Sequence, residues 1–362
     1  MPDVVVVGGG VVGLTIAWEL AGRGLKVRVL DQSAPGREAS WAGAGILPPG
    51  HPGDPTHPLA QLTTLSNSLW PTMTGALRDG TGIDNGFRKC GGLEFGSGGP
   101  SALQQEIEAW RRAGVPVEKL PTSDLHRYEP ALAPGIAEGY RLADLCQVRN
   151  PRHLKALVAS CEQRGVEISS NEEATAWEHR EGRAIGVRTE RAIHNADWFV
   201  LAAGAWSSPL ASAIGVEIDV APVRGQIVLL DAPEIRLTHV LECGPRYVVP
   251  RDDGHILIGS TEENAGFVKE NTPEVIAGLI DFGSALLPAI RQARVERTWA
   301  GLRPQARRGR PWIGPARTLP NVILATGHFR AGLHLSPATA QLISQHIRGE
   351  KTTLPLELFM EG

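Results

Sequence analysis

Three glycines near the N-terminus, Gly8, Gly10 and Gly13, have the spacing of a loop that binds the phosphates of a dinucleotide. The first suits a sharp turn, the second lets backbone approach a pyrophosphate, and the third allows a helix to pack closely on a strand. Asp31 follows Gly13 by eighteen residues, where a carboxylate accepts hydrogen bonds from ribose hydroxyls. The pattern predicts an adenine dinucleotide, with a purely structural glycine turn as the alternative. It does not choose between NAD and FAD.

The elements around these glycines have the order that such a site needs. Residues 4–7 are all valine, as is typical of a buried parallel strand, and apolar residues then recur at helical spacing as far as Gly24. A second strand over residues 27–30 ends directly before Asp31. We therefore expect the diphosphate at the helix N-terminus, where unpaired N–H groups and the helix dipole favour negative charge.

Later segments predict a second kind of sheet. The strand over residues 198–201 runs into Ala202, Ala203 and Gly204, small residues that let a dinucleotide pass close to the strand end. Short apolar strands separated by Pro, Asp and Gly turns then indicate an antiparallel sheet, at residues 226–230, 246–250 and 255–259. A buried strand at 322–325 and a helix at 337–347 follow. We predict a mixed α/β fold with an antiparallel domain inserted into a dinucleotide-binding one.

Composition narrows the classes of partner. Of 362 residues, 42% are hydrophobic and 21% are charged, and the formal charge is −3, which excludes a disordered tail and argues against nucleic acid or an anionic membrane. The uncharged stretch 4–18 is shorter than the ~20 residues of a membrane span and is broken by glycines. Four cysteines are too few for a disulfide framework and none has metal-ligand spacing. We expect a cytoplasmic protein without a metal.

Motifs spread along the whole chain carry a resemblance to a known family. The sequence resembles the FAD-dependent amine oxidases of the D-amino-acid oxidase superfamily, most closely the glycine oxidases of thiamine biosynthesis. The motifs appear in the same order as in that family: VVVVGGGVVGLTIAWEL at 4–20, AGAGIL at 42–47, GGLEF at 91–95, LAAGAW at 201–206, PVRGQ at 222–226, RYVVPR at 246–251, GLRPQ at 301–305 and GHFRAG at 327–332.

The resemblance implies FAD, in a Rossmann-like domain of the glutathione-reductase type. It places the FAD-binding domain at residues 1–85, 145–220 and 300–362, and the substrate-binding domain at 86–144 and 221–299. A second complete GxGxxG is missing from the sequence, which argues against a separate NAD(P)H site. The last cysteine, Cys243, lies well before GHFRAG, so we expect FAD to be held noncovalently. The residues expected around the flavin nucleotide are Gly8, Gly10, Gly13, Asp31, Ser40, Gly43, Gly45, Ile46, Leu47, Ala174, Ala203, Gly204, Gly301, His328, Arg330, Gly332 and Leu333.

The same resemblance places three side chains at the substrate. Arg303 is expected to bind the substrate carboxylate through its planar fork, with the phenol of Tyr247 as its partner. Arg330 contacts either the substrate or the flavin edge. His328 is a tentative substrate contact, although the family needs no general base. Glu262 falls on the amine side of the pocket, where it binds the ammonium or a cationic N-substituent, or else is a solvated acid together with Glu263.

The reaction implied is the oxidation of glycine, small N-substituted glycines or D-amino acids. A hydride passes from the α-carbon to flavin N5, O2 is reduced to hydrogen peroxide, and water hydrolyses the imine. Three alternatives stay open at this point: a dehydrogenase that passes electrons to a protein or quinone, an oxidase of a larger N-substituted glycine, and a noncatalytic FAD-binding scaffold. The partners expected are the small amine and O2, with neither nucleic acid nor membrane, in a homo-oligomer.

Overall fold

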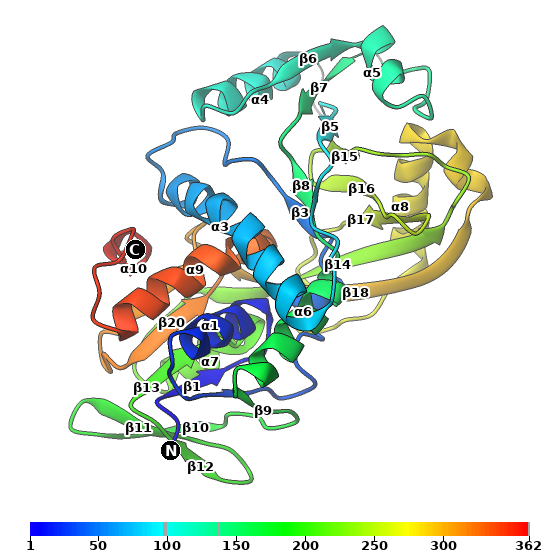
Figure 1. Cartoon of the computed structure of the whole chain (residues 1–362). Helices are drawn as coiled ribbons and strands as arrows, with labels where there is room; N and C mark the ends of the chain where they lie inside the picture. The colour runs from blue at the N-terminus through cyan, green and yellow to red at the C-terminus, as the bar shows by residue number, and fades with distance from the viewer. Residues whose placement is uncertain (97–99, 137, 361–362) are drawn as a thin grey trace.

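The computed structural model describes residues 1–96, 100–136 and 138–360 of the chain (Figure 1). Its first large sheet has six strands, and the run of valines in β1 forms the fully buried centre of it. Parallel pairing joins all neighbours except β19, which runs antiparallel to β20 at one edge. The order across this sheet is β19 (Trp312–Pro315), β20 (Val322–Thr326), β13 (Trp198–Leu201), β1 (Val4–Val7), β2 (Val27–Leu30) and β9 (Glu167–Ser169).

Four long helices pack beside this sheet and on one another: α1 (Val11–Gly22), α3 (Pro58–Thr81), α6 (Asn150–Gln163) and α9 (Gly332–Ile347). Helix α9 begins five residues earlier than the sequence predicts, and Pro337 lies inside it. A proline lacks the N–H that the carbonyl of Leu333 would otherwise accept. The hydroxyl of Ser336 donates to that carbonyl at 2.9 Å instead, which helps the helix to include the proline.

The second large sheet has eight strands, all antiparallel to their neighbours except for the parallel pair β15 and β5. Helix α8 (Pro273–Leu286) shares an apolar cluster with one face, and α4 (Pro100–Arg112) with the other. The order is β18 (Arg294–Ala306), β14 (Val220–Asp231), β17 (His255–Gly259), β16 (Arg246–Pro250), β15 (Val240–Cys243), β5 (Gly92–Glu94), β7 (Glu138–Leu142) and β6 (Glu118–Pro121).

The remaining elements are short. A small sheet holds β3 (Ile46–Leu47), β8 (Cys146–Gln147) and β4 (Arg88–Lys89), and another holds β10 (Ala176–Arg180), β11 (Arg183–Arg188) and β12 (Ile193–Asn195). The short helices are α2 (Ala39–Ala42), α5 (Thr122–Tyr128), α7 (Ser207–Ser212), α10 (Glu357–Met360) and the 3-10 turns η1 (Gly204–Trp206), η2 (Pro288–Gln292) and η3 (Phe329–Ala331).

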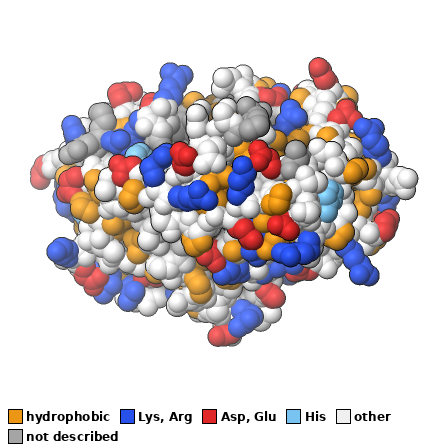
Figure 2. Space-filling model, turned by 90° about the horizontal axis from the view of Figure 1, so that it is seen from above, with side chains coloured by type: hydrophobic (Ala, Val, Ile, Leu, Met, Phe, Trp, Pro, Cys, Tyr) orange, Lys and Arg blue, Asp and Glu red, His pale blue; other side chains and the backbone are white. Residues whose placement is uncertain are grey.

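The predicted fold class is confirmed: a mixed α/β chain combines a largely parallel sheet with a largely antiparallel one. The two sheets are linked by β14 and β18, whose paired ends at Val220 and Ala306 join the apolar cluster beside β13. The domain boundaries stay a prediction. In the described part of the chain no helix is both long and apolar enough to cross a membrane. Acidic and basic side chains are interspersed on the face seen in Figure 2.

Candidate active site

A cavity of about 820 Å³ is lined by residues of both large sheets and of the segments between their strands. Its lining includes the end of β1, helix α2, strand β18 and the turn η3. Small residues form much of its wall, as the AGAGIL and LAAGAW segments predict. Such a wall lets a large flat ligand approach the backbone closely. We therefore expect the site residues predicted from the sequence to line this cavity.

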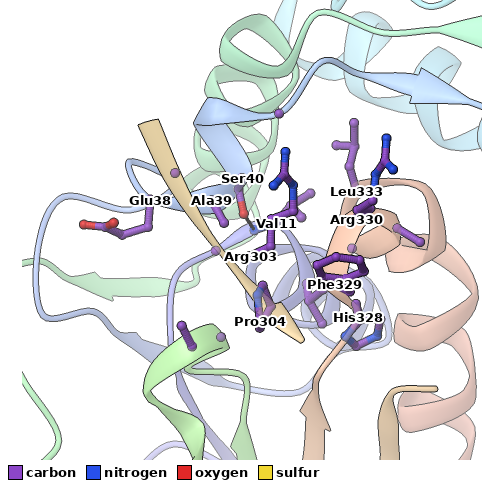
Figure 3. Close-up of a pocket in the computed structure, with 18 of the residues that line it drawn as sticks. Val11, Glu38, Ala39, Ser40, Arg303, Pro304, His328, Phe329, Arg330 and Leu333 are labelled. Carbon is purple, nitrogen blue, oxygen red and sulfur yellow. Dashed lines mark hydrogen bonds between the residues drawn. The ribbon is translucent and has the colours of Figure 1, made fainter. Parts of the chain in front are cut away.

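The glycine loop and the start of α1 form one end of the cavity. Gly8 and Gly10 line it, and α1 begins directly afterwards at Val11. No acidic side chain stands in the first turn of this helix, so its positive end is not offset locally. The N–H of Val11 donates to Oγ of Ser40 at 2.9 Å, which fixes the serine hydroxyl beside the helix N-terminus (Figure 3). This end is suited to a diphosphate.

Asp31 lies at the carboxyl end of β2 and lines the same cavity. Its Oδ2 accepts from the N–H of Gly9 at 2.7 Å, and its Oδ1 accepts from the N–H of Ser33 at 2.8 Å. Two backbone donors thus hold the carboxylate in one orientation. Each carboxylate oxygen can accept more than one hydrogen bond, so Asp31 retains capacity for ribose hydroxyls.

The turn between β20 and α9 forms another wall. Phe329 has a φ of 51°, in the left-handed region that a bulky side chain rarely occupies. That conformation, together with Gly327 at a φ of 79°, brings the chain from the end of β20 into η3 and then α9. Figure 3 shows Arg330 and Leu333 directed into the cavity from this segment. Strained backbone of this kind is frequent at ligand sites.

The side chains of Arg303 and Tyr247 extend across the eight-stranded sheet, and each passes over a glycine of another strand. A Cβ added to Gly225 would come within 2.2 Å of the guanidinium of Arg303, and one added to Gly259 would come within 2.6 Å of the Tyr247 ring. Both side chains therefore need the space that these glycines leave. They line the cavity from β18 and β16, on either side of β14 and β17.

The guanidinium of Arg303 is fixed at two of its nitrogens. Nη1 donates to the carbonyl of Thr261 at 2.9 Å and Nη2 donates to Oγ of Ser260 at 2.6 Å. Burial lowers its pKa from the ordinary value, while the neighbouring Tyr247 acts to raise it. A guanidinium carries five N–H donors, so this arrangement orients Arg303 without using all of them. It can bind a carboxylate that enters the cavity.

Arg330 is held by a carboxylate and a carbonyl outside η3. Its Nη1 donates to Oε1 of Glu262 at 3.1 Å, and its Nη2 donates to the carbonyl of Pro245 at 3.1 Å. The side chain lines the cavity and points in the same direction as that of Arg303 (Figure 3). Arg330 is thus a second cation near the first, with about one-third of its side chain exposed, and Glu262 offsets part of its charge.

His328 lines the cavity but is itself buried. Burial lowers its pKa to about 3, so the imidazole is neutral across the ordinary pH range. Its Nε2 shares a hydrogen bond with Oγ1 of Thr339 at 3.0 Å, which ties the ring to α9. His328 is consequently a neutral wall residue and is poorly suited to take a proton from a substrate.

The structure brings most of the predicted residues together. Those that line the cavity are Gly8, Gly10, Asp31, Ser40, Gly43, Gly45, Ile46, Ala174, Ala203, Gly204, Tyr247, Gly301, Arg303, His328, Arg330, Gly332 and Leu333.

Three predicted residues do not line the cavity. Gly13 instead faces the loop, where a Cβ would come within 1.9 Å of the carbonyl of Gly8, so it serves helix packing. Leu47 packs beside Trp70 and Val148. Glu262 lies outside the lining, where it is paired with Arg330, and its charge also acts to raise the pKa of Arg303.

Glu263 is not the solvated acid that the sequence suggested. Its carboxylate forms an ion pair with Arg224 and accepts from Nε2 of Gln226 at 3.0 Å. The hydroxyl of Thr261 donates to it as well. Glu263 is thus part of the support beneath Arg303, because Thr261 also supplies a carbonyl to that arginine.

Sequence reasoning missed the five glutamates that line the cavity, Glu38, Glu94, Glu172, Glu173 and Glu242, and two of them lie side by side. Glu94 and Glu242 both line it, and they lie on the adjacent strands β5 and β15. Glu94 belongs to the GGLEF motif, and Glu242 stands five residues before Tyr247. The only feature of the local sequence that could have indicated Glu94 or Glu242 is a single acidic residue at the end of a short apolar run. Their proximity depends on a pairing between distant segments, which no local pattern shows.

A comparison with known sequence families decides what this arrangement is. A family described as FAD dependent oxidoreductase matches residues 3–346, nearly the whole chain. The chain belongs to this family. The dinucleotide predicted from the glycine loop is therefore FAD, as the family resemblance implies. The helix N-terminus at Val11, the carboxylate of Asp31 and the small-residue wall fit an adenine dinucleotide.

Individual members of the FAD-dependent oxidoreductase family resemble the chain over its full length. A glycine oxidase from Pseudomonas aeruginosa is 36% identical over 96% of this chain and 95% of its own length. Another, from Pseudomonas putida, is 37% identical over 96% of this chain and 94% of its own. The crystal structure of glycine oxidase from Geobacillus kaustophilus superposes with a TM-score of 0.95 at 29% identity, covering 100% of this chain and 98% of that one.

Proposed function

We propose that this chain is an FAD-dependent oxidase of glycine and similarly small amino acids. The observation that carries the proposal is the buried Arg303 guanidinium beside the Tyr247 phenol, in the cavity that also holds the glycine loop. The relatives named glycine oxidase support the same substrate class. A free amino acid has one feature that all such substrates share, its carboxylate, and Arg303 is placed to recognise it.

The first contribution of the chain is to bind and orient the substrate. Ser260 and Thr261 hold the guanidinium of Arg303 still, so that little side-chain entropy is lost when a carboxylate binds. Removal from bulk water strengthens this charge-assisted contact. The hydroxyl of Tyr247 completes the carboxylate site. With the carboxylate fixed, the α-carbon has a restricted set of positions in the cavity.

FAD, when bound, accepts the hydride that leaves the α-carbon. Gly8, Gly10 and the N-terminus of α1 would hold its diphosphate, and Asp31 its adenosine ribose. The turn Phe329–Ala331 and the start of α9 would lie at its flavin end, where the positive end of a helix favours added negative charge. His328 stays neutral there and holds its ring against Thr339.

An oxidase and a dehydrogenase differ in what takes the electrons from the enzyme. The names of the curated relatives favour the oxidase. The test is to follow oxygen consumption and hydrogen peroxide in air after adding glycine, with no other acceptor present. We expect peroxide to form in step with oxygen loss. Turnover that requires an added quinone or carrier protein would exclude the oxidase.

The cellular setting follows from separate observations. All four cysteines are free, which supports a reducing compartment, and we propose a cytoplasmic enzyme. We also propose a homo-oligomer, which light scattering on the purified protein would test, and a division into an FAD-binding part (1–85, 145–220 and 300–362) and a substrate-binding part (86–144 and 221–299).

A further inference from the structure

A row of residues crosses the eight-stranded sheet at the level of Tyr247. Glu94 pairs in register with Glu242, Glu242 with Tyr247, and Tyr247 with Gly259. Register partners on neighbouring strands direct their side chains to the same face. Glu94, Glu242 and Tyr247 all line the cavity, so this face is the cavity wall.

The two glutamates have different surroundings. Oε2 of Glu94 accepts from the hydroxyl of Tyr140 at 2.7 Å, and that hydroxyl in turn accepts from Nε1 of Trp110 at 3.2 Å. The carboxylate of Glu242 has no hydrogen-bond partner within the described residues, and Arg330 is the opposite charge that acts on it. One carboxyl is therefore anchored to the wall, while the other faces the cavity with its hydrogen-bonding capacity unused.

A cavity lined by two adjacent carboxyl groups disfavours a further anion and favours a cation. Burial raises the pKa of both Glu94 and Glu242, and the charge of Glu242 raises the pKa of Glu94 further. Glu106 on α4 acts on Glu94 in the same direction, while the Tyr140 hydrogen bond and Arg330 oppose these effects. A positive group placed between the two acids would lower the free energy needed to ionise them.

The position of the pair defines which part of a substrate would reach it. The ring of Tyr247 lies over Gly259 of β17, and the guanidinium of Arg303 lies over Gly225 of the adjacent β14. Glu242 lies on β15, two strands beyond β17, at a spacing of about 4.8 Å per strand. A substrate held by its carboxylate would thus reach Glu242 only through a group about 6 Å long, allowing for the length of the glutamate side chain. Glycine itself does not extend so far.

We propose that Glu242 and Glu94 form a cation-selective subsite for the end of the substrate remote from its carboxylate. This inference rests on the proposed function and names a substrate class within it: glycines whose N-substituent carries a second, positively charged nitrogen. The same pair excludes glycines whose N-substituent carries a carboxylate. The cationic specificity that the sequence alone attached to Glu262 thus belongs to Glu242 and Glu94, since Glu262 is bound by Arg330.

Three amines of similar length separate charge from size. N-(2-aminoethyl)glycine ends in an ammonium, N-propylglycine ends in a methyl group, and iminodiacetate ends in a carboxylate. We expect kcat/KM for the aminoethyl compound to exceed that for the propyl compound by about tenfold, and iminodiacetate to be the poorest substrate. Equal values for the aminoethyl and propyl compounds would overturn the proposal.

Substitutions of Glu242 and Glu94 test whether these two residues cause the preference for a cationic N-substituent. In Glu242→Gln and in Glu94→Gln the aminoethyl-to-propyl ratio should fall towards one, and Glu242→Lys should make iminodiacetate better than the aminoethyl compound. Glu190→Gln, at an exposed position outside the cavity, is the matched control and should retain the wild-type ratio. A wild-type ratio in both Glu242→Gln and Glu94→Gln would place the selectivity elsewhere.

Failure of this inference can be told apart from failure of the proposed function. If glycine and sarcosine are oxidised but the aminoethyl compound has no advantage, the subsite is wrong and the oxidase stands. If none of these amines is oxidised, the proposed function itself fails. Binding of the aminoethyl compound to the FAD-loaded protein, first reduced with dithionite and kept without oxygen so that no hydride can be transferred, is measured by calorimetry. This gives a readout independent of turnover, and Glu242→Gln should weaken the binding about tenfold.

Discussion

Arg330 donates from Nη1 to Oε1 of Glu262 at 3.1 Å, so one oxygen of this acid is used within the protein. Both side chains are about one-third exposed, and an ion pair with this much solvent contact contributes little by itself. Its effect on the site is to restrain Arg330, whose other nitrogen is held by the carbonyl of Pro245. Glu262 is therefore a positioning residue.

Glu262→Gln should have a small effect that works through Arg330. We expect KM for glycine to rise no more than about fivefold, with kcat nearly unchanged, because an exposed pair is worth at most about 1 kcal/mol. In an Arg330→Met background the same change should have no further effect. An effect of Glu262→Gln that persists in full without Arg330 would show a direct contact with the substrate. Glu263→Gln is unsuitable as a control, because Glu263 is paired with Arg224.

Arg303→Ala should leave FAD binding intact and reduce kcat/KM for glycine by a hundredfold or more. The loss of a desolvated two-pronged contact to a carboxylate costs about 3 kcal/mol. Arg303→Lys should recover part of this, since an ammonium keeps the charge but not the planar fork. Arg297→Ala, exposed on the same strand, is the control. Steady-state kinetics that place Arg303→Ala within about threefold of the wild type would remove it from the substrate site.

Asp31→Ala should weaken FAD binding by about 1 to 3 kcal/mol, because the ribose loses a charged acceptor and the N–H groups of Gly9 and Ser33 lose theirs. Titration of apoprotein with FAD, followed by flavin fluorescence, measures the change. Asp281→Ala on the exposed face of α8 should bind FAD as the wild type does. Identical affinities for Asp31→Ala and Asp281→Ala would contradict the assignment.

The sequence predicted the local parts of the site well and the distant pairings poorly. The strand of valines, the glycine loop and Asp31 lie within about one βαβ unit, so their geometry follows from neighbouring residues. Arg303 and Tyr247 were found only through resemblance, because Gly225 and Gly259, which make room for them, lie on other strands. Glu94 and Glu242 meet only through the pairing of β5 with β15, which depends on the tertiary fold.

Helix α3 is hard to predict from the sequence for a different reason. Its sequence begins with Pro58 after a proline-rich loop and contains Pro71, both of which weaken a helical pattern. In the structure Pro58 occupies the first helical position, where no N–H is needed, and Nδ1 of His57 accepts from the N–H of Leu59 at 3.3 Å. Packing against α6 and α9 stabilises this helix, and the local sequence does not show these contacts.

The buried acids should make stability depend on pH. Burial raises the pKa of Glu94 to about 8, far above its value in an unfolded chain, so the native state retains a proton that the unfolded state releases. The free energy of unfolding should therefore fall as the pH rises from about 4.5, the ordinary pKa of a glutamate, to about 8. Thermal unfolding should show a falling Tm over this range in the wild type and in the exposed control Glu190→Gln, and a shallower fall in Glu94→Gln. A steeper or equal slope in Glu94→Gln would contradict the raised pKa.

The central claim is that a small amino acid bound by Arg303 reduces the FAD of this protein. The most direct measurement is the visible absorbance of the FAD-loaded protein after glycine or sarcosine is added in the absence of oxygen. The account predicts loss of the flavin absorbance with these amines, its return when air is admitted, and much slower loss in Arg303→Ala. Flavin that dithionite reduces but that glycine, sarcosine and D-alanine all leave oxidised would contradict the account.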